Sequence, residues 1–501
     1  MGEDQNIFFE PDFNRAIKVQ TSEQKITSHA GAVLLRQLDH RLGLVESLAE
    51  NIRDPRDPAK IRYTAIELLR ERLYALALGY ENQDDLDRLA HDPAMRMATW
   101  DRPGEQVLDE RLASQPTQSR LIDWLSRSTE NREALRHALG DWSHRHLRGT
   151  AKADGRAAMR ITIDIDSFPM TVCGEQRGAA YNGYYRDTVY HPLVASFAVH
   201  GDYDGTRQGH RLGNGFIHAI LRQGQVHTAQ GSRRFMRRVV EHAKRMSRSF
   251  DFRLDAGFTS GDIMDMLTDE KVRFCGRLRK NSVLDRLAGP YVYRPPGRPP
   301  TDGYEWVIEL GRHRADGWKH SQRLILVVVD RPDPRTGQLN LMPRYFFLIT
   351  NWPPALRSGE ELLAHYRKRG TFEDRLGELN EAIGPHLSSR SFEENETTML
   401  LSLLAFNMVS MLRNEFEDAS GGSWDLRRFR QSVLRAGGRV VKHARRLWLH
   451  IEECVGSFWR TMADRLGRLR LASCWESLRG VCRRPWVPPP SHAHLTLVLR
   501  E

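Results

Sequence analysis

One short segment limits what this chain can fold into more than any other. Residues 159–168 read MRITIDIDSF, so three isoleucines alternate with Thr162, Asp164 and Asp166. Side chains two positions apart on a strand point to the same face, and a strand here would therefore carry both aspartates on one face. A buried strand has little reason to do so unless something positive lies there, and a divalent metal ion is the simplest candidate. The alternative is an edge strand with two exposed acids.

The segments that follow predict the rest of an α/β core. Residues 191–200 and 252–255 have the composition of strands, and a very basic helix is predicted over 232–248 between them. Strands and a helix in this order favour a mixed sheet covered by helices. Asp255 ends the last of these strands, as Asp166 ends the first. Because ligands and catalytic groups collect at the strand ends of an open α/β sheet, both are candidate site residues.

Regions of a different character flank this core. Apolar residues recur at helical spacing over 59–78, and Gly79 then provides a helix stop. The chain beyond Pro353 predicts helices up to a proline-rich tail at 486–491. The predicted fold class is α/β, or α+β overall, with a mixed-sheet core. We expect a helical N-terminal region at 1–155 that is a candidate for DNA binding, a core at 156–400 with a β-rich insertion at about 272–352, and a helical basic C-terminal region at 401–501.

A second pattern lies in the segment HYRKRGTFEDRLGELNEAIG. Its polar residues Tyr366, Arg369, Glu373 and Asn380 follow one another at spacings of three, four and seven. About 3.6 residues form one helical turn, so these spacings predict one stripe of a single helix. Because the stripe is polar, it is not the core face of that helix. A solvated face with ordinary Arg–Glu neighbours is the alternative interpretation.

These segments together resemble a known family. The stripe resembles the signature helix of insertion-sequence-4-like DDE transposases, DIDSF resembles the strand of their first aspartate, and RLDAGFTSG that of their second. With GYENQDDLDRLAHDP, LASQPTQSRL, YHPLVASFA, GRLRKNSVLDRLA and LITNWP, the resemblance is closest to the insertion sequence 1380 family. It extends from roughly Asn14 to the mid-400s. The chain departs from the family at Asn380, where the family has a lysine, and an asparagine supplies no cation to a DNA phosphate.

The resemblance implies an RNase H-like core whose catalytic, metal-binding carboxylates are Asp166, Asp255 and Glu373. Asp164 shares the face of Asp166 and remains the alternative first ligand. Two Mg²⁺ ions can activate a nucleophile and stabilise a leaving oxygen at phosphorus, as cleavage and joining of DNA require. Mg²⁺, or Mn²⁺ in its place, prefers carboxylates, water and phosphate oxygens, so no cysteine or histidine ligand is needed. The family also implies that the β-rich insertion grips transposon-end DNA.

Double-stranded DNA is the partner that charge and resemblance both favour. The net charge is +11 and the sequence pI about 9.5, and a surplus of this kind attracts polyanions. The candidate DNA-contacting residues are Tyr366 and Arg369 beside Glu373, and Arg234, Arg237, Arg238 and Lys244 on the basic helix. A later basic cluster between Arg427 and Arg446 is a further candidate surface, with a solvated face as the alternative. The expected DNA is the terminal inverted repeats and the target, bound by a homodimer by analogy.

Several other classes of protein are disfavoured by what the sequence lacks. Its five cysteines form no C-x-x-C pair, which argues against a disulfide framework and a zinc site. The N-terminal residues do not have the pattern of a signal peptide, and no apolar run approaches the ~18 residues that cross a membrane. No P-loop is present, so ATP is not implied. We expect a bacterial cytoplasmic, nucleoid-associated protein with no membrane partner.

The predicted function is therefore that of a DNA transposase. It would cleave the terminal inverted repeats of an insertion sequence and join the 3′ ends to target DNA. One alternative is a metal-dependent DNA endonuclease without strand transfer, and another is a non-catalytic DNA-binding protein derived from a transposase. Decay would tend to remove clustered acids, so the presence of all three carboxylates argues against the last alternative. Only the family resemblance separates the first two.

Overall fold

The computed structural model describes residues 7–469, except 10–11, 14–15, 17–18, 21–22, 154–159, 173, 201–210, 295, 297–302, 333–334, 336–337, 339–341 and 421–423. The proline-rich tail predicted at 486–491 lies outside the described residues, as do Cys173, Cys474 and Cys482. Two of the five cysteines are free thiols, Cys275 in the interior and Cys454 on the surface. None of the helices in these described ranges is long and apolar enough to span a bilayer.

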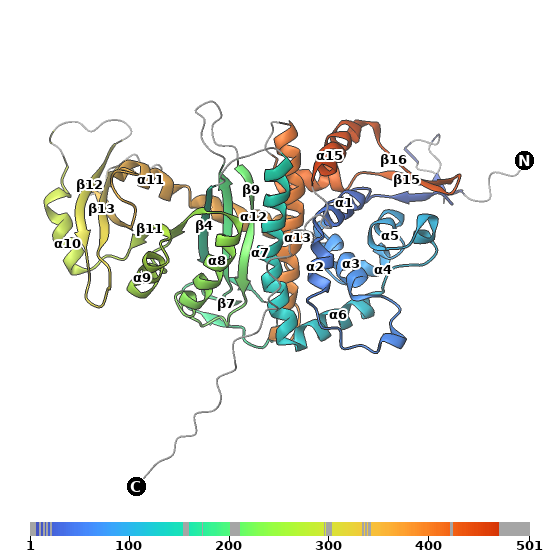
Figure 1. The fold of residues 1–501 in the computed structure, drawn as a ribbon, viewed down its shortest axis with the longest axis horizontal. Helices are drawn as coiled ribbons and strands as arrows, with labels where there is room; N and C mark the ends of the chain where they lie inside the picture. The colour runs from blue at the N-terminus through green and yellow to red at the C-terminus, as the bar shows by residue number, and fades with distance from the viewer. Residues whose placement is uncertain are drawn as a thin grey trace, which may run out of the picture.

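An eight-stranded mixed sheet extends from one end of the molecule to the long helices at its middle, in the order β12-β13-β14-β11-β10-β4-β8-β9 (Figure 1). Its first five strands in sequence are β4 (Arg160–Ser167), β8 (Leu193–His200), β9 (Arg211–Ile220), β10 (Ser249–Leu254) and β11 (Arg273–Leu278). The strands β4, β8 and β9 are antiparallel neighbours, whereas β10 and β11 run parallel to β4. Helices α8 (Ser232–Met246) and α9 (Gly261–Asp269) make the crossover connections that such parallel strands require. The α/β fold class with a mixed-sheet core is confirmed, and the order of strands and helices agrees with the expected RNase H-like core.

The β-rich segment between the second and third candidate acids continues this sheet. It contains β12 (Tyr304–His313), β13 (Gln322–Asp330) and β14 (Arg344–Thr350), preceded by α10 (Ser282–Ala288). Strand β14 pairs antiparallel with β11, so hydrogen bonding runs unbroken from the core into the insertion. The three insertion strands therefore have their positions fixed relative to the strands that carry Asp166 and Asp255.

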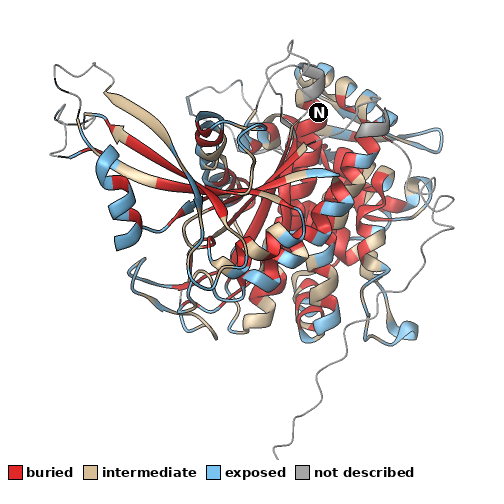
Figure 2. Ribbon diagram, turned by 60° about the vertical axis from the view of Figure 1, so that its left-hand side comes forward, coloured by how far each residue is buried: buried red, intermediate tan, exposed pale blue. Residues whose placement is uncertain are grey.

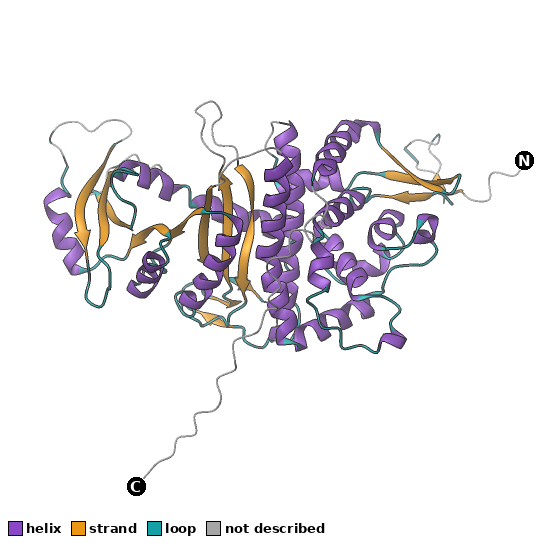
Figure 3. Ribbon diagram, viewed as in Figure 1, coloured by secondary structure: helices purple, strands orange, loops and turns teal. Residues whose placement is uncertain are grey.

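Two long helices separate the sheet from the N-terminal helices. Figure 1 and Figure 3 show α7 (Thr129–Ala153) and α13 (Phe392–Ser420) beside each other, with β9 on one side and helices on the other. Those helices are α1 (Ala32–Leu42), α2 (Leu44–Ala49), α3 (Ala65–Ala77), α4 (Asp85–Leu89), α5 (Pro93–Thr99) and α6 (Gln115–Arg127). Helices make up most of the regular structure in the described part of the N-terminal region, and Gly79 follows the end of α3 with a φ of 85°.

The buried apolar residues form separate hydrophobic cores between the sheet and the helices that cover it. One core lies on the face of the sheet covered by α8 and α9 and includes Ile161, Ile163 and Ile165. A larger core joins α13 and α7 to the N-terminal helices, and Figure 2 shows buried residues continuous through this part of the molecule. A small third core, with Cys275 and Leu348, lies under α11 (Gly359–Arg367). The alternation predicted for 159–168 is thus real, because its isoleucines share one buried face.

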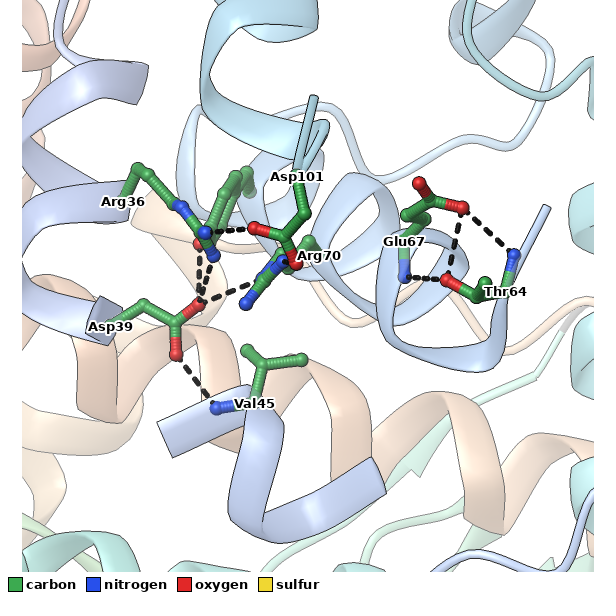
Figure 4. Close-up of polar contacts among 8 residues, drawn as sticks. Arg36, Asp39, Val45, Thr64, Glu67, Arg70 and Asp101 are labelled. Atoms are coloured by element: carbon green, nitrogen blue, oxygen red, sulfur yellow. Dashed lines mark hydrogen bonds and ion pairs between the residues drawn. The ribbon is translucent and has the colours of Figure 1, made fainter. Parts of the chain in front are cut away.

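Polar side chains also fix the N-terminal helices (Figure 4). The buried carboxylate of Asp39 accepts hydrogen bonds from the Nε of Arg70 at 3.2 Å and from the backbone N–H of Val45 at 2.7 Å. Thr64 and Glu67 form a capping box at the start of α3. A capping box satisfies backbone donors that have no partner within the helix, so the start of α3 is well defined.

The C-terminal region differs from the prediction. The chain forms α12 (Gly370–Ala382), α14 (Leu426–Phe429), a π-helical turn η5 (Arg430–Leu434) and α15 (Gly456–Arg468), but residues 438–451 are not helical. They form a hairpin of β15 (Gly438–His443) and β16 (Arg446–Ile451), which pairs with β3 (Lys25–Thr27). The β-branched Val440 and Val441 and the aromatic Trp448 favour strand over helix here. Smaller strands are β1 (Ile7–Phe9) with β2 (Val19–Gln20), and β5 (Met170–Thr171), β7 (Asp187–Tyr190) and β6 (Ala180–Asn182).

Candidate active site

Asp166 and Asp255 lie at the same end of two neighbouring parallel strands. In the register of β4 and β10, Ile165 is the partner of Leu254, so the next residue on each chain is one of these aspartates. Each is only partly buried, whereas the residues before them are fully buried. Backbone register, which is rigid, therefore brings two carboxylates from segments far apart in sequence to one sheet edge.

Asp164, two residues earlier on the same face of β4, has a different environment. Its side chain is 0% exposed and its two oxygens accept hydrogen bonds from the Nε and Nη2 of Arg253 at 2.8 and 2.5 Å. Arg253 is its neighbour on β10, and its remaining nitrogen Nη1 donates to the backbone oxygen of His365 at 3.2 Å. Both carboxylate oxygens of Asp164 are occupied by this buried ion pair.

Asp166 also pairs with an arginine, but at the open end of the strand. Arg369 donates from Nη2 to one oxygen of Asp166, and the backbone N–H of Ser167 donates to the other at 2.8 Å. Burial raises the pKa of Asp166, Arg369 opposes that effect, and the charge of Asp255 adds to it, so that the pKa lies above its usual value. Because the pKa is raised although Arg369 is a partner, the positive charge near Asp166 does not offset the effects of burial and of Asp255 on this carboxylate.

Arg369 itself is buried without all the partners that it needs. Its Nε has no hydrogen-bond partner among the described residues. Asp166, Asp255 and Tyr366 all act on its pKa, which is raised although burial alone would lower it. The guanidinium therefore lies among the candidate site residues and supplies the positive charge that their carboxylates face.

The helix predicted to carry Tyr366, Arg369 and Glu373 together is in fact two helices. Tyr366 belongs to α11 and Glu373 to α12, and the chain turns at Lys368 and Arg369 between them. Hydrogen bonds from Arg369 N to Tyr366 O and from Phe372 N to Arg369 O span three residues instead of four. This tighter turn precedes Gly370, a poor helix former. The prediction of one continuous stripe is wrong at this point.

The break determines where the third acid lies. Glu373 is exposed in the first turn of α12, one turn after Arg369. The α12 helix is anchored on the sheet by Phe372, which is fully buried, and by Arg375, whose Nη1 donates to the hydroxyl of Ser196 on β8. Glu373 thus lies close in sequence to a residue that contacts Asp166, and its side chain faces solvent. Asn380 is also exposed, near the end of α12.

A buried polar strip on the sheet supports α11 beneath these residues. The Nε2 of His365 lies 2.6 Å from an oxygen of Asp251 on β10, in addition to the contact of Arg253 with the backbone of His365. Tyr366, the next residue, packs against the small third core. Burial raises the pKa of the Tyr366 phenol to about 12. Sequence reasoning missed this strip, although Asp251, Arg253 and Asp255 alternate with apolar residues on β10 just as the aspartates do on β4.

The donor set fits a hard divalent cation better than any softer metal. Asp166 and Asp255 provide carboxylate oxygens, and Asp166 currently has a guanidinium where a cation would bind. Among the residues that the structure describes, no three Asp, Glu, His or Cys side chains lie close enough together to hold one metal ion. Glu373 is therefore not part of a three-ligand cluster in this structure. Arg369 contacts Asp166, the carboxylate that Glu373 would have to approach to complete such a cluster.

The basic helix α8 lies on the other face of the sheet from the aspartates. Its buried residues Phe235 and Val239 pack on the core that contains Ile163. Arg234 and Arg237 are exposed, whereas Arg238 pairs with Glu241 at 3.1 Å and Lys244 with Glu270 at 2.5 Å. The structure does not bring these four residues to the candidate acids.

A tyrosine-rich turn reaches the site instead. Burial raises the pKa of Tyr185, and the charge of Asp166 raises it further, so the phenol lies near that carboxylate. Its neighbour Tyr184, in the turn between β6 and β7, is exposed. The repeated tyrosines of YNGYYRDTVY are the sequence signal for this contact.

Comparison with known proteins identifies the class to which this fold and site belong. The family model described as "Transposase DDE domain group 1" matches residues 9–471, and the chain belongs to this family. Among solved structures it is similar to a piggyBac transposase, in a cryo-EM structure of its synaptic complex with hairpin DNA. The two are 14% identical, with a TM-score of 0.37, over 94% of this chain and 90% of that one. No curated protein matches the chain.

Proposed function

We propose that this DDE transposase cleaves the terminal inverted repeats of an insertion sequence and joins the 3′ ends to target DNA. The observation that carries the proposal is the convergence of Asp166 and Asp255 at one sheet edge, with Arg369 on Asp166 and Glu373 one turn further along the chain. Carboxylates from separate segments that meet at such an edge suit two-metal phosphoryl transfer. The resemblance to the insertion sequence 1380 family, which extends from roughly Asn14 to the mid-400s, supports assignment to that group.

Asp166, Asp255 and Glu373 would hold two Mg²⁺ ions, with Mn²⁺ able to replace them. When bound, such ions lower the pKa of the attacking water or 3′-hydroxyl and stabilise the leaving oxygen. The protein's contribution is to hold Asp166 and Asp255 on rigid strands and to deliver Glu373 on α12. Glu373 must turn inward from its exposed position to complete the set.

Asp166 is a better first ligand than Asp164. Binding of a cation by Asp164 would require breaking a bidentate pair that is almost fully excluded from water, which would leave Arg253 buried and unpaired. Asp166 is 24% exposed and gives up only one arginine contact. The alternative that the sequence left open is therefore decided in favour of Asp166 in this proposal.

Arg369 and Tyr366 would act on the DNA. If Asp166 held a cation, Arg369 would no longer be needed to balance its charge, and its guanidinium would be available to the scissile strand, where arginine can form two hydrogen bonds to one phosphate. Tyr366 keeps its proton at neutral pH, since the ordinary pKa of tyrosine is about 10 and burial raises that of Tyr366 to about 12, so its hydroxyl can donate to a phosphate oxygen. Arg234 and Arg237 of α8 would contact DNA beyond the cleavage point, with a homodimer holding two ends together.

The test uses purified protein, linear DNA carrying the ends of its element, a target plasmid and Mg²⁺. We expect metal-dependent cleavage at the ends followed by strand-transfer products. Glu373→Gln should abolish both, whereas Asp374→Asn, a change in the exposed acid next to it on α12, should preserve them. Cleavage without joined products would indicate an endonuclease, and no cleavage by the wild type would refute the enzymatic proposal.

A further inference from the structure

The three-stranded sheet β16-β15-β3 presents one face to the protein and the other to solvent. Val440, Leu447 and Leu449 are on the inner face, where they pack against the large core. On the same side, Lys442 pairs with Glu105 at 2.8 Å. These contacts fix the sheet on the N-terminal helices, at the end of the molecule opposite β12 and β13 (Figure 1).

The outer face combines cationic and apolar side chains. Strand pairing places Val441 opposite Trp448, Arg439 opposite His450 and His443 opposite Arg446, and Ile26 follows on β3 next to Arg439. Trp448 is 50% exposed and Ile26 59% exposed, which is unusual for large apolar residues. We call this set of seven residues the hairpin face: Ile26, Arg439, Val441, His443, Arg446, Trp448 and His450.

The turn of the hairpin adds a further cation in a strained conformation. Ala444 and Arg445 have φ angles of 50° and 61°, in the left-handed region that favours glycine or asparagine. Two such residues are what a tight two-residue hairpin turn requires, and each non-glycine residue there costs about 1 kcal/mol or more. Despite this cost, the tip of the hairpin has an exposed arginine at a position where glycine would be easier to accommodate.

We propose that the hairpin face binds duplex DNA of the transposon end, away from the scissile phosphate. This inference rests on the transposase function proposed above and adds a second DNA contact to it. Arg439 and Arg446 neutralise backbone phosphates, and Arg445 extends the contact beyond the strand ends. Trp448 and Ile26 pack against deoxyribose, which presents apolar surface between phosphates.

Charge decides between DNA and a second copy of the chain as the occupant. The hairpin face contains two arginines, two histidines and no acid among its seven residues. Self-association through this face would bring like charges together, whereas a phosphate backbone complements them. Among the described residues, the side-chain contact of Arg439 is a long one, 3.5 Å to Gln24, and no ion pair is formed by Arg439 or Arg446. Within this part of the chain, no acid neutralises the two guanidinium groups.

The experiment measures binding of a labelled duplex carrying the element's end sequence as a function of salt concentration. For the full-length protein, Arg439→Ala with Arg446→Ala should weaken binding and reduce the slope of log affinity against log salt by about 1 for each arginine. Trp448→Ala should weaken binding with an unchanged slope, because it removes no charge. Arg460→Ala with Arg468→Ala, which removes two exposed arginines of α15, is the matched control and should change neither quantity.

Three outcomes are informative, provided that each variant has the wild-type melting temperature. A reduced slope in the hairpin pair alone supports the inference. Wild-type binding by the hairpin pair and by Trp448→Ala overturns it, while the transposase function stands. In that case, a lower oligomeric mass in light scattering would identify a second copy as the occupant. Failure of the wild type to bind the duplex would refute the proposed function itself.

Discussion

Strand β4 carries two aspartate–arginine pairs, two residues apart on one face, and they differ in almost every physical respect. Asp164 and Arg253 are 0% and 3% exposed, and two short hydrogen bonds join them. Asp166 and Arg369 are 24% and 14% exposed, and a single contact joins them. Arg253 comes from the neighbouring strand, whereas Arg369 comes from a turn between two helices.

The difference shows how one residue pattern can serve two purposes. Inside the sheet, the pair has no access to water or ligand, so breaking it would leave a buried charge unpaired. At the strand end, the arginine lies in a turn between two helices, and its Nε lacks a partner among the described residues. The inner pair therefore fixes β4 to β10, and the outer pair balances charge at the site that we propose to bind cations.

The largest expected effect separates the two pairs by stability. Asp164→Ala leaves Arg253 without its partner in the interior and should lower the free energy of unfolding by about 3–5 kcal/mol. Asp166→Ala, at the partly exposed end, should cost about 1 kcal/mol or less. Urea unfolding followed by circular dichroism measures both. Equal losses for the two variants would remove the distinction between them.

The next effect separates the two regions by activity. Asp255→Asn should reduce end cleavage by roughly a hundredfold to a thousandfold, comparable to removal of a preorganised charge interaction at a reaction centre. Asp262→Asn, a change in an acid of the first turn of α9, is a control that keeps the charge change but lies outside the carboxylate pair. Single-turnover cleavage of labelled ends gives the rates. Near-normal cleavage by Asp255→Asn would refute its catalytic role.

A smaller effect tests whether Arg369 occupies the cation position. Removing its charge in Arg369→Ala should strengthen Mn²⁺ binding to the DNA-free protein about tenfold, which corresponds to about 1.4 kcal/mol. Electron paramagnetic resonance of free Mn²⁺ measures this affinity without reference to activity. Arg367→Ala, whose partner is Glu305, is the control. Unchanged or weaker Mn²⁺ binding by Arg369→Ala would contradict the idea of competition.

The smallest effect concerns the pH dependence of stability and the buried contact between Asp251 and His365. Burial raises the pKa of Asp251, but the hydrogen bond from His365 and the charges of Arg357 and Arg253 outweigh it, so the pKa lies below its usual value. A lowered folded-state pKa gives stability that is present above the unfolded-state pKa of about 3.9 and is lost as the pH falls through the folded-state pKa.

Loss of the His365 contact should therefore remove part of this pH-dependent stability. His365→Ala removes the hydrogen bond to Asp251, so its urea midpoint should lie below that of the wild type near pH 7, and the gap between the two should narrow as the pH falls below about 3.9. Urea titrations of both proteins at a series of pH values, from pH 7 down to the pH of acid unfolding, give the two profiles. Parallel pH profiles for the two proteins would mean that this contact does not stabilise the ionised carboxylate.

Much of the catalytic sheet could be predicted from the sequence because its strands alternate strictly. The period of two in MRITIDIDSF placed Asp164 and Asp166 on one face, and Asp255 directly follows the last residue of β10. Alternation cannot tell which aspartate is enclosed, because that depends on Arg253 reaching across from a strand 89 positions away in sequence. The long-range pairing, and not the local pattern, distinguishes a structural acid from an open one.

Local patterns failed where the backbone departs from regular geometry. The spacing of Tyr366, Arg369 and Glu373 is compatible with one helix, and the pattern contains no proline to reveal the turn before Gly370. Likewise, the basic residues around Arg439 obscured the alternation of a hairpin whose turn has Ala444 and Arg445 instead of the usual asparagine and glycine. Both misjudged segments carry residues that we assign to DNA contact.

Anomalous scattering from Mn²⁺ in crystals of the protein bound to its transposon-end DNA tests the central claim most directly. The account predicts Mn²⁺ in contact with Asp166 and Asp255, with Arg369 displaced from Asp166 and the pair of Asp164 and Arg253 intact. Mn²⁺ bound to Asp164, or an unbroken contact of Arg369 with Asp166 in a complex that cleaves DNA, would contradict it.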